Sequence, residues 1–505
     1  MAIASKLQEK RTGLNDNLML HLSRKDLIVT HAWIANERVP SSDGRGFAVE
    51  NPADGSLIAQ VADCGAAEAR AAADAGHKAF ASWRKLLAKE RSAHLQRWLA
   101  EVRKNEDDLA RLISLEEGKP LAESRAEVAY GAAYIEWFAE EAKRTYGDVI
   151  PETASGRKIL VMKEPVGVTA AITPWNFPIA MLARKIAPAL AAGCTIVAKP
   201  AEDTPLSALA LALLAAEAGI PSGVINFVPA SRKNAGAVAD VWLSDQRVRK
   251  LSFTGSTAVG KHLAGASATT LKRLSLELGG NAPFIVFEDA DLDQAVRGMI
   301  TAKFRNAGQT CICANRIYVA DQIYDEFAQR AVEAVGKLRV GPAGGDAEIG
   351  PLINARAFEK VERHVANALE HGARVLTGGN RHELGRYFYQ PTVLVDVDSS
   401  MMLSCEETFG PVAPLFRFHT EEEAISAANN TPFGLAAYFY SRDIARVMRV
   451  SAALESGMVG INEAAISTEV APFGGVKDSG YGREGSPYGI DEYLQTKYLC
   501  LGGLT

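Results

Sequence analysis

The residues best suited to chemistry in this sequence lie between Phe304 and Cys313. One thiol, Cys311, follows a Gly-Gln-Thr sequence, and a second, Cys313, lies two residues further on. Cysteines buried as small hydrophobic residues usually lie within apolar runs, whereas reactive thiols occupy polar, partly exposed pockets. The polar setting of Cys311 therefore favours a nucleophile, although this segment alone leaves a structural cysteine equally open.

The bulk properties of the chain exclude several classes of protein. At 505 residues it is too long for one hydrophobic core, and its length predicts roughly three domains. A net charge of −5 gives no basic surface for nucleic acid, and no window approaches the roughly 18 apolar residues of a membrane span. Six unevenly spaced cysteines suit a reducing compartment and match no zinc pattern. We therefore expect a cytoplasmic protein with no metal, nucleic-acid or membrane partner.

Elements able to position a reactive thiol recur regularly after residue 166. Short strands are predicted at 168–172, 195–198, 224–228, 248–253 and 273–276, and helices at 179–192, 205–218, 233–241 and 256–266. Alternating helices and mostly apolar strands indicate a parallel sheet covered on both faces, so we predict an α/β fold with a doubly wound sheet. Ligands of such sheets bind beyond the carboxyl ends of the strands.

The remaining segments are less regular. Residues 1–20 lack the apolar region of a signal peptide and are expected to form a loosely ordered extension. Helical patterns cover 66–83, 90–115 and 123–146, and we interpret the aromatic stripe of the last one as core (Tyr130, Tyr134, Trp137 and Phe138). Later strands are predicted at 284–287, 316–319, 374–376, 392–397, 436–440 and 458–461, with helices at 292–304 and 324–338. The glycine-rich run 472–485 is expected to pass close to a site.

Two further segments suggest contact with another subunit. A strand near residue 160 follows a turn and has the character of an arm leaving its domain. Such an arm offers an edge for pairing with another chain. The final apolar strand, 497–501, is the expected partner of this arm within the chain.

Polar residues follow the predicted parallel strands at the edge where ligands bind. Asn176, between Pro174 and Pro178, loses little entropy on being fixed, so its amide is a candidate preorganised donor. Lys199 and Glu202 follow the second strand, and a glycine-containing loop, 254–260, opens a helix in a manner suited to phosphate. Glu277 ends the fifth strand before two glycines; it is a candidate general base, although ordinary turns have the same pattern.

Six separated motifs, taken together, resemble those of the NAD(P)-dependent aldehyde dehydrogenases. They are Pro174–Pro178 (PWNFP), Lys199–Glu202 (KPAE), Phe253–Ser256 (FTGS), Leu276–Gly280 (LELGG), Gly308–Cys311 (GQTC) and Glu406–Pro411 (EETFGP). The resemblance runs from about residue 30 to the end. It implies a cofactor domain (21–146 and 166–280), a catalytic domain (281–485) and a small β oligomerisation element (147–165 and 486–505). Members of the family form homodimers or homotetramers.

The resemblance also implies a mechanism. Cys311 would attack an aldehyde, and the amide of Asn176 and the backbone N–H of Cys311 would stabilise the oxyanion. After hydride transfer Glu277 would activate water to hydrolyse the thioester. A base at this position argues against the CoA-acylating relatives. The alternative is a non-catalytic binding or structural protein on the same fold, which the intact Cys311, Glu277 and Asn176 disfavour.

The family also implies where the cofactor binds. The implied contacts are Thr173, Pro174, Trp175, Lys199, Glu202, Gly255, Ser256, Gly260, Glu407 and Phe409. A carboxylate accepts from a free 2′-hydroxyl but repels a 2′-phosphate, so Glu202 predicts that NAD is preferred. Lys199 acts in the opposite direction and keeps NADP possible.

Three further stretches are Thr173–Pro178 followed by Arg184 and Lys185, the run Lys303–Cys313, and Ile466-Ser467 before Ala471–Gly475. By these stretches the chain resembles, within the family, the succinate-semialdehyde dehydrogenases most closely. This resemblance implies that Arg184, Arg305 and Ser467 bind the distal carboxylate of the substrate, as charge-assisted hydrogen bonds allow. The stretch 462–465 departs from the expected small residues, so glutarate semialdehyde, one methylene longer, is the close alternative. Cys313 is either a spectator or the partner of Cys311 in a reversible disulfide.

Overall fold

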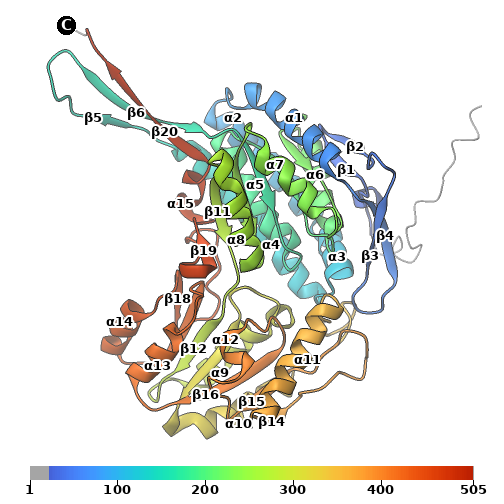
Figure 1. Ribbon diagram of the computed structural model, residues 1–505, viewed down its shortest axis with the longest axis vertical. Coiled ribbons are helices and arrows are strands. Elements are labelled where there is room, and N and C mark those ends of the chain that lie inside the picture. The colour runs from blue at the N-terminus through green and yellow to red at the C-terminus, as the bar shows by residue number, and fades with distance from the viewer. Residues whose placement is uncertain (1–21, 504–505) are drawn as a thin grey trace, which may run out of the picture.

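The computed structural model describes residues 22–503, so the predicted extension at 1–20 lies outside the described residues. Two large sheets dominate, one in each half of the molecule, and a narrow three-stranded arm projects from the upper half (Figure 1). None of the described helices combines the length and the apolar character that a bilayer crossing requires.

The eight-stranded sheet of the upper half has the order β19-β11-β10-β7-β8-β9-β1-β2. Its strands are β1 (Ala32–Ile34), β2 (Glu37–Val39), β7 (Val168–Ile172), β8 (Thr195–Lys199), β9 (Ile225–Phe227), β10 (Val248–Thr254), β11 (Arg273–Glu277) and β19 (Gly480–Tyr481). The five central strands run parallel, as the apolar runs predict. A separate hairpin, β3 (Gly46–Glu50) and β4 (Leu57–Ala62), lies beside it (Figure 1).

Helices cover both faces of this sheet. Within β7, Val168 and Ala170 enter one buried cluster, with α1, α7 and α8, whereas Ala171 enters the other, with α2 to α6. This alternation is what a doubly wound sheet requires, because successive side chains point to opposite faces. The helices are α1 (Ala66–Trp83), α2 (Ala88–Lys104), α3 (Glu106–Glu117), α4 (Leu121–Glu141), α5 (Pro178–Ala192), α6 (Pro205–Glu217), α7 (Ala235–Ser244) and α8 (Thr257–Ser267).

The helical pattern predicted at 90–115 is divided into two helices. The chain leaves helical geometry at Asn105, with φ −107° and ψ 18°, and the Asn105 amide donates to the Glu101 carbonyl at 2.7 Å. The new helix then begins with three acidic residues, Glu106, Asp107 and Asp108. Negative charge is favourable at a helix N-terminus, so the local sequence stabilises a second start.

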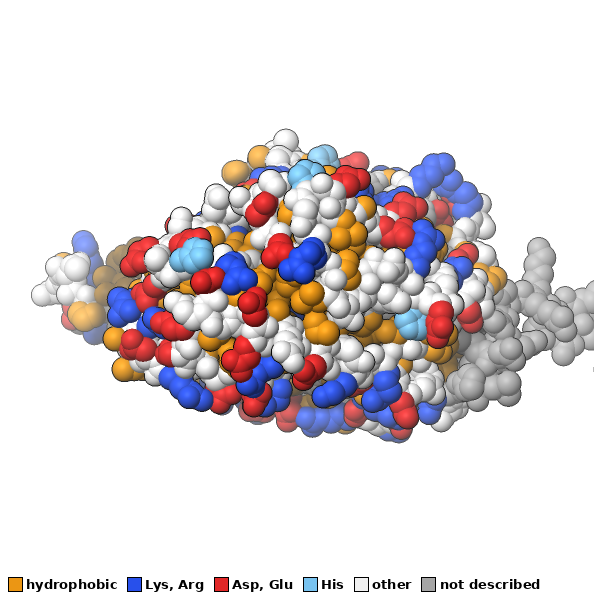
Figure 2. Space-filling model, turned by 90° about the horizontal axis from the view of Figure 1, so that it is seen from below, with side chains coloured by type: hydrophobic (Ala, Val, Ile, Leu, Met, Phe, Trp, Pro, Cys, Tyr) orange, Lys and Arg blue, Asp and Glu red, His pale blue; other side chains and the backbone are white. Residues whose placement is uncertain are grey.

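The seven-stranded sheet of the lower half has the order β14-β15-β16-β13-β12-β17-β18. Its strands are β12 (Ala282–Val286), β13 (Ala314–Ala320), β14 (Arg374–Thr377), β15 (Thr392–Val395), β16 (Val412–Phe418), β17 (Ala436–Tyr440) and β18 (Met458–Ile461). β16 is absent from the predicted strands, because Pro414 interrupts its pattern. The helices of this half are α9 (Leu292–Phe304), α10 (Tyr324–Val335), α11 (Ala355–Glu370), α12 (Met402–Cys405), α13 (Glu421–Asn429) and α14 (Ile444–Ala453). Figure 2 shows acidic and basic side chains interspersed over the lower end.

The arm consists of β5 (Asp148–Ile150), β6 (Lys158–Pro165) and β20 (Leu494–Leu501). β20 pairs antiparallel with β6 along its whole length, from Leu494 opposite Pro165 to Leu501 opposite Lys158, which confirms the predicted pairing of the last strand with the arm. The helix α15 (Ser486–Asp491) leads into β20.

The chain returns once from the lower half to the upper sheet. β19 pairs antiparallel with β11, with Gly480 opposite Glu277 and Tyr481 opposite Leu276. A segment placed in the predicted catalytic domain, 281–485, therefore supplies an edge strand of the other sheet. The predicted domain limits themselves stay a prediction.

Candidate active site

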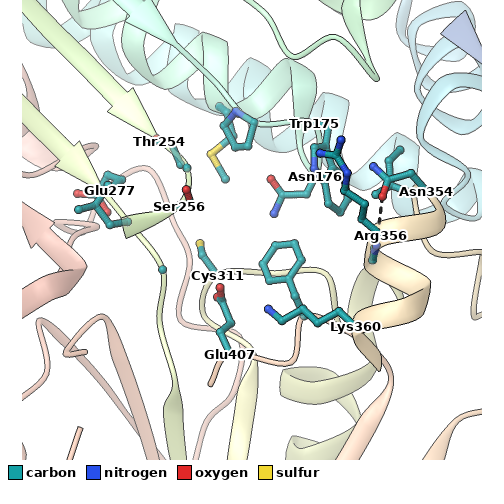
Figure 3. A pocket seen from close by; sticks show the side chains of 18 of the residues that line it. Trp175, Asn176, Thr254, Ser256, Glu277, Cys311, Asn354, Arg356, Lys360 and Glu407 are labelled. Carbon is teal, nitrogen blue, oxygen red and sulfur yellow. Dashed lines mark hydrogen bonds between the residues drawn. The ribbon is translucent and has the colours of Figure 1, made fainter. Parts of the chain in front are cut away.

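A cavity of about 370 Å³ lies where the carboxyl ends of the upper parallel strands face the lower half (Figure 3). Its walls come from the residues after β7, β10 and β11, the segment around Cys311, the start of α11 and residues 407–409. Nine of the predicted site residues line it: Pro174, Trp175, Asn176, Gly255, Ser256, Glu277, Cys311, Glu407 and Phe409. The side chains of Asn176, Cys311 and Glu407 point into the same space (Figure 3).

Cys311 follows a turn with unusual backbone geometry. α9 ends at Phe304, and Asn306 and Ala307 then adopt left-handed φ angles of 52° and 54°. The turn is fixed by several contacts: the Asn306 N–H donates to the Glu123 carboxylate at 3.0 Å, and the Gln309 side-chain oxygen accepts from the Ile353 N–H at 2.9 Å. Left-handed non-glycine residues persist where surrounding contacts over-determine them, which is common at active sites.

The surroundings of the Cys311 thiol disfavour its thiolate form. Burial raises its pKa to about 12; Arg184 acts in the opposite direction, and Glu407 and Glu277 add to the rise. The thiolate is the nucleophilic form, so attack requires transfer of the proton to a base. Two carboxyl groups, those of Glu277 and Glu407, line the same cavity.

The amide of Asn176 is held with one hydrogen available. Its Nδ2 donates to the Gln309 carbonyl at 2.9 Å, which fixes the orientation of the amide because a carbonyl can only accept. The Asn176 side chain is 2% exposed. An amide nitrogen carries two hydrogens, so the second is free to meet a ligand in the cavity.

Glu277 is a buried carboxyl group at the end of β11. It is 2% exposed, and neither of its oxygens has a hydrogen-bond partner among the described residues. Burial raises its pKa well above the usual range and Glu484 adds to this, whereas Arg184 and Lys185 lower it. The predicted approach of the glycine-rich run is confirmed: a Cβ on Gly474 would lie 2.8 Å from the Glu277 Oε1.

The cofactor side of the cavity combines aromatic, acidic and glycine residues. Trp175 and Phe409 meet edge to face, with ring centroids 5.7 Å apart. Burial raises the pKa of Glu407 to about 7, and its carboxylate accepts from the Gly280 N–H at 3.3 Å. A Cβ on Gly260 would lie 2.4 Å from a Leu278 methyl carbon, so glycine lets α8 pack closely there.

Four predicted cofactor residues do not line this cavity. Thr173 and Lys199 are buried beside it, and Gly260 packs against Leu278. Glu202 lines an adjoining cavity of about 270 Å³, which shares Arg232 with the first. The Lys199 ammonium lies 3.6 Å from the Glu202 carboxylate.

The predicted substrate residues separate into two places. Arg305 and Ser467 line another cavity, of about 240 Å³, and the Arg305 guanidinium lies 4.8 Å from the centroid of the Phe177 ring. Arg184 is 1% exposed, forms an ion pair with Glu484 and does not line that cavity. The structure thus brings Arg305 and Ser467 together and gives Arg184 a protein partner.

One predicted core residue also faces a cavity. Tyr134 and Phe138 are buried as expected, and Tyr130 and Trp137 are half-buried and pack against the same core. Tyr130 lines the cavity of Arg305 as well. Its hydroxyl lies 2.9 Å from that of Tyr134. The helical stripe is therefore not uniformly core, because α4 turns its N-terminal half toward the site.

Cys313 is buried in the protein and does not line the cavity of Cys311. It is 0% exposed, and its thiol donates to the Lys303 carbonyl at 3.4 Å. Both Cys311 and Cys313 are free thiols in this state.

Several lining residues were not predicted. They include Arg232, Asn354, Arg356 and Lys360. Arg356 and Lys360 lie four positions apart on α11 and so share one face, a spacing of cations that the sequence does contain. Nothing in the sequence shows that this helix faces the loop of Cys311. Among residues 22–503 no group of His, Cys, Asp and Glu is arranged to hold a metal ion.

Comparison with known proteins identifies a family. The aldehyde dehydrogenase family matches residues 39–499. The succinate-semialdehyde dehydrogenase [NADP(+)] GabD of Escherichia coli is 56% identical over 96% of this chain and 100% of its own length. Two other relatives are equally similar at 56% over 96% of this chain: a 3-sulfolactaldehyde dehydrogenase of Pseudomonas putida and a glutarate-semialdehyde dehydrogenase of Pseudomonas aeruginosa, covered over 100% and 99% of their lengths.

A solved structure has the same fold as this chain over nearly its whole length. The crystal structure of succinate-semialdehyde dehydrogenase from Burkholderia pseudomallei superimposes with a TM-score of 0.94 at 56% identity, covering 95% of this chain and 99% of that one.

Proposed function

Because the chain belongs to the aldehyde dehydrogenase family, we propose that it oxidises succinate semialdehyde to succinate with reduction of NAD(P). The observation that carries this proposal is the convergence of Cys311, the Asn176 amide and Glu277 on one cavity, with an arginine in the next.

The residues of the cavity support each step. Cys311 as thiolate attacks the aldehyde carbon, and the free hydrogen of the Asn176 amide meets the developing oxyanion. NAD(P), when bound, supplies the hydride acceptor. The thioester left on Cys311 is hydrolysed by water whose proton passes to the Glu277 carboxylate.

The lining of the cavity fits a dinucleotide. Gly255 and Ser256 lie at the start of α8, whose first turn has no side-chain cap, so its N–H groups can receive phosphate. Lys360 and Arg356 on α11 add positive charge to the lining of the cavity, and the Glu407 carboxylate can accept from ribose hydroxyls.

We infer that NAD is the preferred cofactor. The Glu202 carboxylate neutralises Lys199 at 3.6 Å and repels a 2′-phosphate. The E. coli relative is named for NADP(+), so the test is direct: kcat/KM is measured with both cofactors, and a higher value with NADP would contradict this inference.

The substrate is inferred to carry an anionic tail. Arg305 and Ser467 face the cavity that adjoins Phe177, and the named substrates of the three relatives all end in a carboxylate or sulfonate. Glutarate semialdehyde is the second candidate. The stretch 462–465, which differs from the small residues expected there, lines none of the cavities described above. Instead the Glu463 carboxylate accepts from the Ala464 and Ala465 N–H groups at 2.8 Å.

One assay tests these assignments together. Reduced nicotinamide is followed by absorbance after mixing protein and NAD with succinate semialdehyde, glutarate semialdehyde, 3-sulfolactaldehyde or butanal, with Cys311→Ala as control. We expect the highest kcat/KM with succinate semialdehyde and the lowest with butanal. Equal efficiency with butanal would contradict anion recognition by Arg305.

Two further proposals concern assembly and control. The arm exposes Val149, Met162 and Tyr498, which supports a homodimer or homotetramer; light scattering during size exclusion tests this.

A reversible Cys311–Cys313 disulfide would switch the enzyme off under oxidation. It predicts that thiol restores peroxide-treated wild type better than Cys313→Ala. Location in the cytoplasm stays a prediction.

A further inference from the structure

The turn between α3 and α4 contacts the backbone of the cavity-lining residue Asn176. It consists of Gly118, Lys119 and Pro120, and Gly118 adopts a left-handed φ of 93°. A Cβ on Gly118 would lie 2.7 Å from Pro351, so the turn is pressed against the segment that also contacts Gln309. No motif of the family resemblance includes this turn.

The ammonium group of Lys119 is buried behind Asn176 and contacts only protein groups among the described residues. The Lys119 side chain is 0% exposed, and its Nζ lies 2.6 Å from the Asn176 carbonyl oxygen and 2.7 Å from the Glu127 Oε2. The same ammonium lies 4.0 Å from the centroid of the Phe177 ring. The Glu117 carboxylate lies further from the ammonium than that of Glu127 does, at 3.9 Å. A buried ammonium is costly unless it is paired and hydrogen-bonded, and here two carboxylates, a carbonyl and an aromatic face surround it.

Glu127 extends this contact to the following helix. Its Oε1 accepts from the Ile179 N–H at 2.9 Å, in the first turn of α5. Lys119 and Glu127 together therefore hold the chain on both sides of Phe177 and Pro178. The backbone of Asn176 has no other cationic donor among the described residues.

The amide of Asn176 depends on this backbone being fixed. Its side chain contacts the Gln309 carbonyl, and its own carbonyl also accepts from the Asn306 amide at 3.1 Å. Lys119 thus joins a set of contacts that fixes Asn176 relative to the turn before Cys311. A displacement of about 1 Å can cost on the order of 100-fold in rate when a group must meet a transition state.

We propose that Lys119, paired with Glu127, is the positioning residue for the Asn176 amide and acts on the rate of the chemical step. The proposal rests on the proposed function, since it takes Asn176 as the donor to the oxyanion. It assigns Lys119 no contact with substrate or cofactor. Lys119 acts through the Asn176 backbone.

The test is a double-mutant cycle read in single turnovers. Lys119→Met and Asn176→Ala are made alone and together, and the rate of reduced-nicotinamide formation is measured with saturating NAD and succinate semialdehyde. We expect Lys119→Met to lower this rate by about 10- to 100-fold in the wild-type background, with KM changed by less than about threefold. In the Asn176→Ala background it should cause no further loss.

Two controls separate positioning from stability. Lys250→Met removes another fully buried lysine, whose ammonium donates a hydrogen bond to the Ser275 hydroxyl on β11. Lys250 lines neither the cavity of Cys311 nor that of Arg305, so this change should lower Tm without lowering the rate. Lys119→Arg keeps the charge and should restore part of the rate. If Lys119→Met does not fold, Glu127→Gln provides the cycle, because it weakens the pair while keeping its size.

The outcomes are distinct. An equal loss from Lys119→Met in both backgrounds, or a loss confined to KM, overturns the positioning role. If Asn176→Ala itself leaves the single-turnover rate unchanged, the proposed oxyanion role of Asn176 is wrong, and that result does not depend on Lys119.

Discussion

The cofactor-side cavity and the cavity of Arg305 are built in different ways. Loops that follow strands line much of the first, with glycines and prolines whose backbone geometry leaves a pattern in the sequence. Helix α4 lines the second with Glu123, Ala126, Glu127 and Tyr130, and single residues from distant segments complete it. The chemistry common to many aldehydes thus comes from several short motifs, each recognisable in the sequence, whereas substrate choice depends on single residues from distant segments.

The largest effect should come from the cavity shared by all substrates. Cys311→Ala removes the nucleophile, and we expect kcat to fall by at least about 10⁴-fold with every aldehyde. Absorbance of reduced nicotinamide measures it, with NAD binding by calorimetry as the control for folding. Residual turnover above this level would place the nucleophile elsewhere.

Glu277→Gln should separate the two halves of the reaction. Hydrolysis should fall by about 10²- to 10⁴-fold, whereas the first turnover still yields reduced nicotinamide, so a burst appears. Because burial and Glu484 raise the pKa of Glu277, its base form is gained as pH rises, and wild-type hydrolysis should rise with pH. The pH dependence should vanish in Glu277→Gln; its persistence would assign the base to another group.

Arg305→Met should distinguish substrates, unlike the two changes above. We expect kcat/KM for succinate semialdehyde to fall by about 10²-fold, as loss of a charge-assisted pair predicts, with butanal unchanged. Arg184→Met should instead slow both aldehydes, because Arg184 pairs with Glu484 and lowers the pKa of Cys311. If Arg184→Met slows only the anionic substrate, Arg184 belongs to the anion site.

The smallest effect concerns the cofactor. Glu202→Ser removes the carboxylate beside Lys199, and we expect the ratio of kcat/KM for NADP to that for NAD to rise about tenfold, since the residue is half-exposed and screened. The aldehyde preference should not change. A shift in aldehyde preference would show that the two cavities are coupled.

Much of the upper sheet could be predicted, because apolar strands and short loops repeat locally. Asn176, Glu277 and Gly255 were found for this reason: Glu277 ends β11, Gly255 directly follows β10, and Asn176 lies in the loop after β7. The ion pair of Arg184 with Glu484 could not be predicted, since it joins segments about 300 residues apart. The second role of Tyr130, in lining a cavity, could not be predicted because its helical spacing is identical to that of core residues, and only the packing of α4 shows which side is open.

The pairing of β19 with β11 has a consequence for unfolding. Tyr481 pairs with Leu276, and Gly480 pairs with Glu277. The lower half therefore cannot separate from the upper half without breaking the pairing of this edge strand. A Cβ on Gly480 would lie 2.0 Å from the Leu276 carbonyl oxygen, so only glycine permits this closeness. We expect calorimetry to record a single heat-capacity peak, and Gly480→Ala to divide it into two, because the halves would then melt separately.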